Sequence, residues 1–290
     1  MVAKSPPYSL DDLRYLMQRL RDPADGCPWD LKQDYRSIAV STLEEAFEVV
    51  DAIEREDYPD LREELGDLLF QVIYHSQLAE EEQRFDVGDV ISDLVTKLVR
   101  RHPHVFPDGT LQSRAAMAAS PEGEANIKQR WEALKQQERE GKGKAGVLDD
   151  VPVNFPALTR AAKLQKRAAG VGFDWPGEEG VLEKIAEELE EVRDALDAAE
   201  TDAVEEELGD LLFAVVNLCR HRKVDPEKAL RRTNRKFEQR FRFIEQQLAA
   251  QGISPAEATL DEMDNLWNQA KAESRGETIA EVRNPLLRSE

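Results

Sequence analysis

The chain has 290 residues, of which 41% are hydrophobic and 34% are charged, and its formal net charge is −20. Such an acidic chain offers no broad cationic face for phosphates, so we expect no non-specific binding to nucleic acid or to an anionic membrane surface. A small phosphorylated substrate is not excluded, because a metal ion and a few basic side chains can reverse the charge of one site.

No segment approaches the roughly 20 apolar residues that a membrane-spanning helix needs. The first ten residues contain two prolines and no apolar run, which is not typical of a secretory signal. Only two cysteines occur, Cys27 and Cys219. We therefore expect no disulfide framework and a cytoplasmic protein.

The first domain, predicted over residues 1–115, begins its clearest helix near residue 43 and ends it near residue 54. Pro59 can open the next helix, because its missing N–H is not needed in the first turn. A further helix is predicted over 90–101, where His102-Pro103 ends it. Residues 116–146 are rich in Ala, Gln, Glu and Lys and read as a partly helical connector.

The second domain is predicted over residues 147–290. Asp202 and Glu205 have the spacing of a capping box at the start of one helix. Another helix is predicted from 226 to 250, ended by Gly252, and Ser254-Pro255 is expected to start a last helix. Strand signals are almost absent, so the chain is predicted to be all-α.

An internal repeat organises the sequence. Residues 44–70 read EEAFEVVDAIEREDYPDLREELGDLLF, and residues 187–213 read EELEEVRDALDAAETDAVEEELGDLLF. The two segments align without a gap at a separation of 143 positions, and both end in EELGDLLF. This similarity predicts two tandem copies of one domain, each containing two helices joined by a tight turn.

Each copy carries four carboxylates at helical spacing. Residues three apart share a helix face, so an antiparallel helix pair would bring all four together. Mg²⁺ prefers such hard oxygen ligands, and Mn²⁺ is an alternative ion. The predicted metal ligands are Glu45, Glu48, Glu64 and Asp67 in the first copy, and Glu188, Glu191, Glu207 and Asp210 in the second.

A solvated acidic helix face is the simpler explanation for any single pair of these acids. Two features favour a metal site instead. The acidic side of the second helix continues into Gln71 and Tyr74 rather than into further charges. Four crowded carboxylates also repel one another unless they are protonated or bind a cation. Gly66 and Gly209, inside these helices, are expected to mark close helix packing, although a nearby substrate would also explain them.

Basic and aromatic residues follow the second quartet. Lys236 and Arg240 lie four positions apart on one helix face, where they can neutralise phosphate oxygens, with Asn234 on the neighbouring turn. The first copy offers Lys97 and Arg101. A solvated basic face is an equally good reading of either segment. Trp267 can stack on a base, or it belongs to the core. The remaining aromatic and histidine candidates, Trp29, Trp175, His102 and His104, are interpreted as structural.

Several motifs resemble those of the MazG family of nucleoside triphosphate pyrophosphohydrolases. CPWD, TLEEAFEVVDAI, DLREELGDLLFQVIYH and RRHPHVF are similar to its first domain. FPALTRAAKLQKRAAGVGFDW, EELGDLLFAVVNLCRH and NRKFEQRF are similar to its second domain. The resemblance covers residues 8–271. One departure is Ala203, which stands where some relatives have a basic residue.

The resemblance implies four-helix bundles completed by homodimerisation, and Mg²⁺-dependent hydrolysis of ribo- and deoxyribonucleoside triphosphates to the monophosphate and pyrophosphate. It also implies the two carboxylate quartets as metal ligands and nucleotide contacts from Lys184, Lys236, Arg240 and Trp267. The first copy has no evident counterpart of Trp267. We therefore expect catalysis in the second copy, with Glu188, Glu191, Lys236 and Arg240 as its catalytic residues.

Two other classes of protein share part of this sequence pattern. Ferritin-like di-iron oxidoreductases also use helix-borne carboxylates, but they need E-x-x-H motifs, and the fourth position here is Glu or Asp in both copies. A non-catalytic dimeric module that senses nucleotides or binds a regulatory partner is the alternative to the enzyme.

Overall fold

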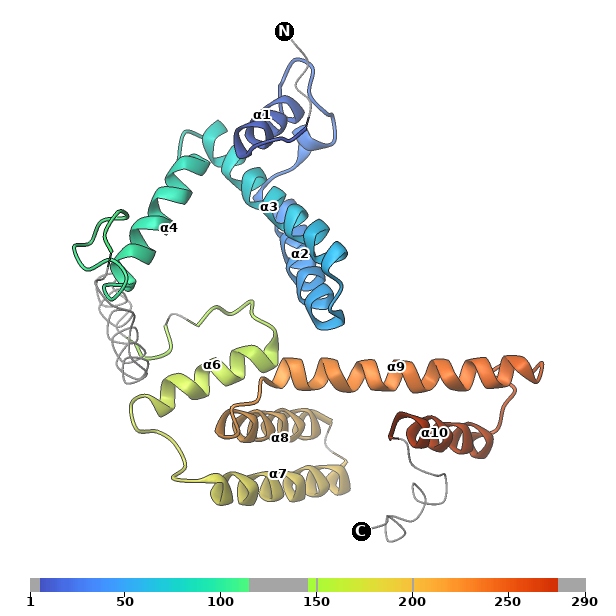
Figure 1. Cartoon of the computed structure of the whole chain (residues 1–290). Helices are drawn as coiled ribbons and strands as arrows, with labels where there is room; N and C mark the ends of the chain where they lie inside the picture. Colours follow the sequence, from blue (N-terminus) through green and yellow to red (C-terminus); the bar gives the residue numbers. More distant parts are fainter. Residues whose placement is uncertain (1–5, 115–145, 150, 200, 276–290) are drawn as a thin grey trace. The chain divides into compact units, whose positions relative to one another are not determined.

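The computed structural model describes residues 6–114, 146–149, 151–199 and 201–275. Within these ranges every regular element is a helix, which confirms the all-α prediction. The chain divides into two compact units, each described here by itself (Figure 1). Unit 1 contains α1 (Leu10–Leu20), the 3₁₀ turn η1 (Asp30–Lys32), α2 (Tyr35–Arg55), α3 (Tyr58–Glu81) and α4 (Val87–Arg101). Unit 2 contains α6 (Ala157–Ala169), α7 (Glu178–Ala198), α8 (Thr201–His221), α9 (Pro226–Ala250) and α10 (Leu260–Arg275). The predicted connector, apart from Gly146, falls outside the described residues.

The central feature of each unit is a helical hairpin, α2–α3 in unit 1 and α7–α8 in unit 2 (Figure 1). Helices α2 and α7 have 21 residues each and begin and end 143 positions apart. Both end in a left-handed residue, Glu56 with φ of 58° and Ala199 with φ of 55°. The duplication seen in the sequence therefore extends to helix length, turn and cap.

Capping explains where these helices begin. The Asp34 side chain accepts hydrogen bonds from the backbone of Arg36 and Ser37, so α2 starts eight residues before the predicted position. Asp57 caps α3 and Pro59 lies in its first turn, as expected. Asp225 caps α9, whose observed limits agree with the predicted ones.

Two further helix starts, those of α8 and α10, also differ from the predicted ones. Asp202 is inside α8, which begins at Thr201, so it is not the cap that the sequence indicated. Ser254 and Glu257 do form reciprocal bonds, with the Ser254 amide 2.9 Å from Glu257 Oε2. They close only a turn, and α10 begins at Leu260 after a second Thr-x-x-Glu box at Thr259.

Each unit has a small apolar core, which includes hairpin residues in unit 1 and lies between α9 and α10 in unit 2. In unit 1 the core joins α1, α2, α3 and α4 through Met17, Ile38, Ile73, Tyr74, Leu78 and Val87. In unit 2 a core between α9 and α10 is formed by Ile244, Leu248 and Leu266, with Trp267 packed against it. These cores hold α1 and α4 on the first hairpin, and α10 on α9.

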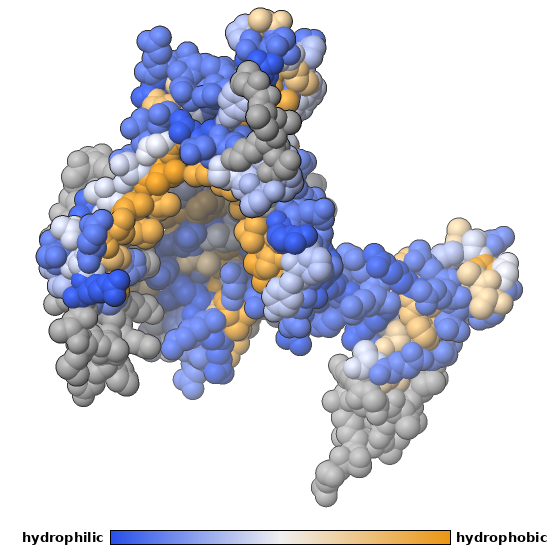
Figure 2. Space-filling model, turned by 45° about the horizontal axis from the view of Figure 1, so that its top comes forward, coloured by the Kyte–Doolittle hydropathy of each residue, from blue (hydrophilic) through white to orange (hydrophobic). Residues whose placement is uncertain are grey.

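Both hairpins leave an equivalent apolar stripe exposed. Its members are related by the 143-residue repeat: Ile53, Leu65, Leu69 and Val72 in unit 1, and Leu196, Leu208, Leu212 and Val215 in unit 2. Figure 2 shows broad hydrophobic areas at the molecular surface. Exposed apolar patches of this kind are typical of protein interfaces.

Gly66 and Gly209 lie in these same helices. A Cβ atom built on either would meet no heavy atom within 4 Å. The prediction that they allow close helix packing is therefore wrong within the described chain, where both positions face open space. No described helix is long and apolar enough to cross a membrane.

Candidate functional site

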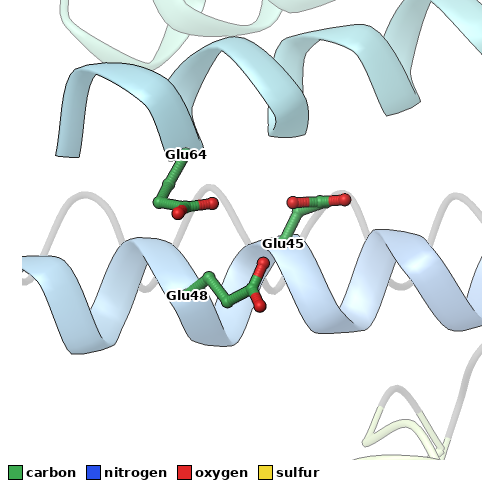
Figure 3. A group of neighbouring side chains, drawn as sticks. All are labelled: Glu45, Glu48 and Glu64. Atoms are coloured by element: carbon green, nitrogen blue, oxygen red, sulfur yellow. The ribbon is translucent and has the colours of Figure 1, made fainter. Parts of the chain in front are cut away.

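The first carboxylate cluster lies between α2 and α3. Glu45 and Glu48 project from α2 and Glu64 projects from α3 toward them (Figure 3). One carboxylate oxygen from each lies within 4.8 Å of the other two. The hairpin thus brings together three members of the predicted quartet by the i, i+3 spacing on α2 and the antiparallel approach of α3.

Asp67 belongs to the same electrostatic group. Partial removal from water raises the pKa of Glu45, and the negative charges of Asp67 and Glu48 raise it further. The pKa of Glu64 is raised in the same way, by desolvation and then by Glu48. The negative charges of Glu48 and Asp67 therefore oppose the ionisation of Glu45 and Glu64, and a divalent cation would relieve that repulsion.

The second cluster, between α7 and α8, is more enclosed. Glu188, Glu207 and Asp210 have carboxylate oxygens within 4.8 Å of one another, and Glu188 is only 4% exposed. A hydrogen bond with Glu188 is the main cause of the raised pKa of Glu191, and desolvation adds to it. The fourth predicted ligand is therefore adjacent to the cluster.

Lys184 joins the second cluster one turn before Glu188. Its Nζ lies 2.7 Å from Glu188 Oε1, 2.9 Å from Glu187 Oε1 and 4.0 Å from Glu191 Oε2. These hydrogen bonds, the one to Glu188 first, raise the pKa of Lys184, which stays protonated. The predicted phosphate-binding lysine is thus next to the predicted metal ligands.

The donor sets fit a hard divalent cation. Each cluster offers only carboxylate oxygens, which Mg²⁺ and Mn²⁺ prefer, and no sulfur or imidazole ligand belongs to either group. Open coordination positions would remain for water and phosphate, since one-oxygen contributions from three or four acids do not fill an octahedron.

The predicted phosphate-binding residues of α9 lie in a groove between α9 and α10. Lys236, Gln239, Arg240 and Phe243 line one side, and Ala270, Glu273 and Ser274 line the other. The Arg240 guanidinium lies 5.3 Å from the centre of the Trp267 ring, and Phe237 packs on the same ring at 5.3 Å. Lys236, Arg240 and Trp267 therefore form one cationic and aromatic group. None of the carboxylates of the quartet lines this groove.

The remaining predicted contacts, Asn234, Lys97 and Arg101, do not line the α9–α10 groove. Asn234 is exposed on α9, and Lys97 is exposed on α4. A hollow beside α4 is lined by Arg100 and mainly apolar residues, with neither Lys97 nor Arg101 among them. The described part of the first copy thus reproduces the carboxylates, whereas its hollow beside α4 is lined by one basic residue, Arg100, in place of the Lys236 and Arg240 pair.

The residues interpreted as structural are not buried. Trp29 is 60% exposed and Trp175 is 40% exposed. Trp175 packs over Gly180 near the start of α7, where a Cβ would lie 2.5 Å from Trp175 Cδ1. His102 and His104 stack loosely at 5.6 Å, and His102 Nδ1 bonds the Leu98 carbonyl. They have no place in either carboxylate cluster.

An arginine–carboxylate pair fixes the entry to each hairpin. In unit 1 the Arg21 guanidinium donates to both Glu81 oxygens, at 2.9 and 2.7 Å, and also to the Asp30 carbonyl. In unit 2 the pair is reversed, since Arg220 on α8 donates to both oxygens of Asp174 in the segment before α7. Both pairs tie the preceding segment to the far end of the second hairpin helix, which holds the helix carrying the EELGD acids in place.

Sequence reasoning missed the other groove residues, Gln239, Phe243 and Glu273. Their spacing contains a usable signal, because Lys236, Gln239, Arg240 and Phe243 follow the i, i+3, i+4, i+7 pattern of one helix face. The approach of α10 supplies Glu273, and no local pattern indicates it.

The fold and these clusters define a class of protein: a tandem all-α protein with a helix-borne carboxylate centre in each half. The sequence matches the MazG nucleotide pyrophosphohydrolase domain over residues 33–106 and again over 177–242. The chain belongs to this family.

The chain is similar along most of its length to named relatives. It is 48% identical over 264 residues to the nucleoside triphosphate pyrophosphohydrolase of Escherichia coli K12, covering 90% of this chain and 97% of that protein. It is 41% identical over 261 residues to a Thermotoga maritima protein named nucleoside triphosphate pyrophosphohydrolase/pyrophosphatase MazG, covering 90% and 95% respectively. A Bacillus subtilis protein, YabN, is 41% identical over 269 residues, which are 53% of its length.

Proposed function

We propose that this protein hydrolyses ribo- and deoxyribonucleoside triphosphates to the nucleoside monophosphate and pyrophosphate, with Mg²⁺ held by the carboxylate quartets. The E. coli and T. maritima relatives named for this activity align over nearly the whole chain, which supports the assignment. The observation that carries the choice of site is the second cluster, where a buried Glu188 meets Glu207, Asp210 and Lys184.

In this mechanism the acidic residues of the second copy bind the metal and activate water. Glu188, Glu191, Glu207 and Asp210 would hold the cation, which when bound would polarise the phosphate chain and acidify the attacking water. One of the four carboxylates orients that water and accepts its proton. The oxygen of the water joins the α-phosphorus while the α,β-anhydride bond breaks, so that pyrophosphate leaves with the electron pair.

Cationic side chains stabilise the charge that develops on the leaving group. Lys184 is placed beside the quartet, whereas Lys236 and Arg240 form a pair on α9, with Asn234 exposed two residues before Lys236. Lysine acts as a point charge and arginine as a two-pronged donor, which suits neighbouring phosphate oxygens. Trp267 offers an aromatic face on which the base can stack. Because every base can stack on such a ring, this contact would accept many bases.

A homodimer is part of this proposal. The exposed stripes on both hairpins are equivalent apolar surfaces, and a second copy of the chain would cover them by completing four-helix bundles. The carboxylates and the α9–α10 groove lie on different helix pairs of unit 2, so assembly is the step that would complete the surroundings of the nucleotide. We further propose that the protein acts in the cytoplasm.

The decisive assay incubates the full chain with dNTPs and Mg²⁺ and separates the products. The proposal predicts monophosphate and pyrophosphate in equal amounts, with no turnover when a chelator removes the metal. Nucleoside diphosphate and orthophosphate as products would contradict it. Nucleotide binding without any turnover would favour the non-catalytic sensing module instead.

A further inference from the structure

The two copies differ in the residues that adjoin the quartets. In the first hairpin Glu48 lies with Glu64 and Glu45 interacts with Asp67, so helical spacing puts Ser41 on α2 and Gln71 on α3 at the next positions along the same two faces. The hydrogen bond between Thr42 Oγ1 and His75 Nε2, at 3.0 Å, shows that the two helices remain in contact just beyond them.

The repeat places Lys184 and Ala214 at the equivalent positions of the second hairpin. A hydroxyl and an amide in the first copy are therefore replaced by an ammonium group and a methyl group in the second. We call these two residues beside each quartet the adjoining layer: Ser41 and Gln71 in the first copy, Lys184 and Ala214 in the second. The layer is uncharged in the first copy and carries a positive charge in the second, although the two quartets consist of the same residue types.

In the second copy this layer supplies a cation. Lys184 Nζ contacts Glu188 Oε1 at 2.7 Å, and the Glu188 side chain is 6% exposed. A divalent ion that uses Glu188 must therefore either displace this ammonium group or bind close to it. Like charges at such separations repel strongly in a partly enclosed site.

In the first copy the adjoining layer contains a side-chain oxygen that has no hydrogen-bond partner among the described residues, Gln71 Oε1. Gln71 is 6% exposed. It lies one turn after Asp67 on the helix face that carries Glu64 and Asp67. A buried carbonyl oxygen without a partner is rare, and it is also a hard ligand for a divalent cation, directly or through water.

We propose that the first copy is a divalent-cation site that fills without nucleotide, whereas Lys184 keeps the second site closed to metal until nucleotide phosphates draw the ammonium group away. This inference rests on the metal sites of the proposed function. It makes the first copy a metal-binding module with Ser41 and Gln71 beside its ligands, and Lys184 a positioning residue that couples metal binding to nucleotide binding in the second.

The test is Mn²⁺ binding to the full chain without nucleotide, followed by electron paramagnetic resonance of the free ion. The wild-type chain should show one tight site. Neutralising the first quartet with E45Q/E64Q should abolish that site, and neutralising the second with E188Q/E207Q should leave it unchanged. Loss of the tight site in the second variant and not in the first would overturn the inference.

A matched test exchanges the charge of the adjoining layer between the two copies. S41K should weaken the first site by about tenfold or more, because it places an ammonium group where Lys184 stands in the other copy. S41M, which adds bulk without charge, should bind nearly as wild type. In an E45Q/E64Q background K184M should create a nucleotide-independent Mn²⁺ site in the second copy. Equal loss in S41K and S41M, or no new site in K184M, would contradict the proposal.

The same samples separate this inference from the proposed function. Pyrophosphate release together with two equal Mn²⁺ sites would overturn the inference alone. Absence of Mn²⁺ binding at both copies, with and without a non-hydrolysable nucleotide, would overturn the metal sites themselves and the inference with them.

Discussion

The two units share a hairpin and differ in what surrounds it. Helices α2 and α7 have the same length, the same left-handed cap and carboxylates at the same spacing. Among the described residues, it is unit 2 that has a long α9 and a returning α10, whose groove contains Lys236 and Arg240 with Trp267 beside them. The comparison teaches that the carboxylate hairpin is the part of the domain that is repeated, whereas the cationic and aromatic group lies on elements outside the hairpin.

The largest effect is expected from the carboxylates themselves. E188A or E191A should lower Mg²⁺-dependent pyrophosphate release by at least about 100-fold, because each removes charge stabilisation that the reaction needs. The matched changes E45A and E48A should have little effect on turnover. Comparable losses from both pairs would show that the two copies are catalytically equal, and circular dichroism of each variant checks that it is folded.

The second-largest loss of activity is expected from replacing the two basic residues of α9. Replacing both Lys236 and Arg240 with Met should lower kcat/KM by about 100-fold, since donors aimed at developing phosphate charge contribute strongly in an enclosed site. The equivalent changes K97M and R101M in unit 1 serve as the control and should leave steady-state kinetics near wild type. A large loss from the control pair would place a second nucleotide site in unit 1.

A smaller effect is expected from the aromatic ring. W267A should raise KM by about tenfold with a smaller change in kcat, because stacking on a base contributes about 1–3 kcal/mol. W267F should keep most of the affinity, whereas W29A, in unit 1, should change neither constant. An unchanged KM in W267A would mean that Trp267 serves only the α9–α10 core.

The smallest effect concerns stability and depends on pH. The Arg220 guanidinium lowers the pKa of Asp174 in the folded state, so the stabilisation is present above the unfolded value of about 3.8 and is lost as pH falls through the lower folded pKa. At pH 7, D174N should lower the free energy of unfolding of unit 2 by about 1–3 kcal/mol. The difference from wild type should shrink below pH ~3.8 in thermal unfolding, and D194N, at an exposed site on α7, should show no such dependence.

Much of the fold could be predicted because its signals are local. The gap-free repeat predicted the hairpins, and the predicted limits of α9, from Pro226 to the residues before Gly252, agree with the observed ones. The starts of α2, α8 and α10 were missed because a capping motif does not by itself decide which turn continues as a helix. Ser254 and Glu257 form their bonds and still close only a turn, whereas Asp34 with Ser37 starts α2 without the Ser/Thr and Glu pattern that was sought.

The carboxylate clusters could also be predicted, because i, i+3 spacing and a tight turn place acids on facing helices. The layer beside them could not. Whether Lys184 reaches Glu188, and whether Gln71 Oε1 finds a partner, depends on burial and on side-chain rotamers in the facing helix. The exposure around Gly66 and Gly209 likewise follows from an open hairpin face, which residue type alone does not reveal.

The central claim is that the chain has two carboxylate centres but a single nucleotide site. Calorimetric titration with an α,β-non-hydrolysable dNTP analogue and Mg²⁺ tests it directly. The account predicts one nucleotide bound per chain, and none when Lys236 and Arg240 are both replaced by Met. Two nucleotides per chain, or one that survives this double replacement and is lost on neutralising Glu45 and Glu64, would contradict it.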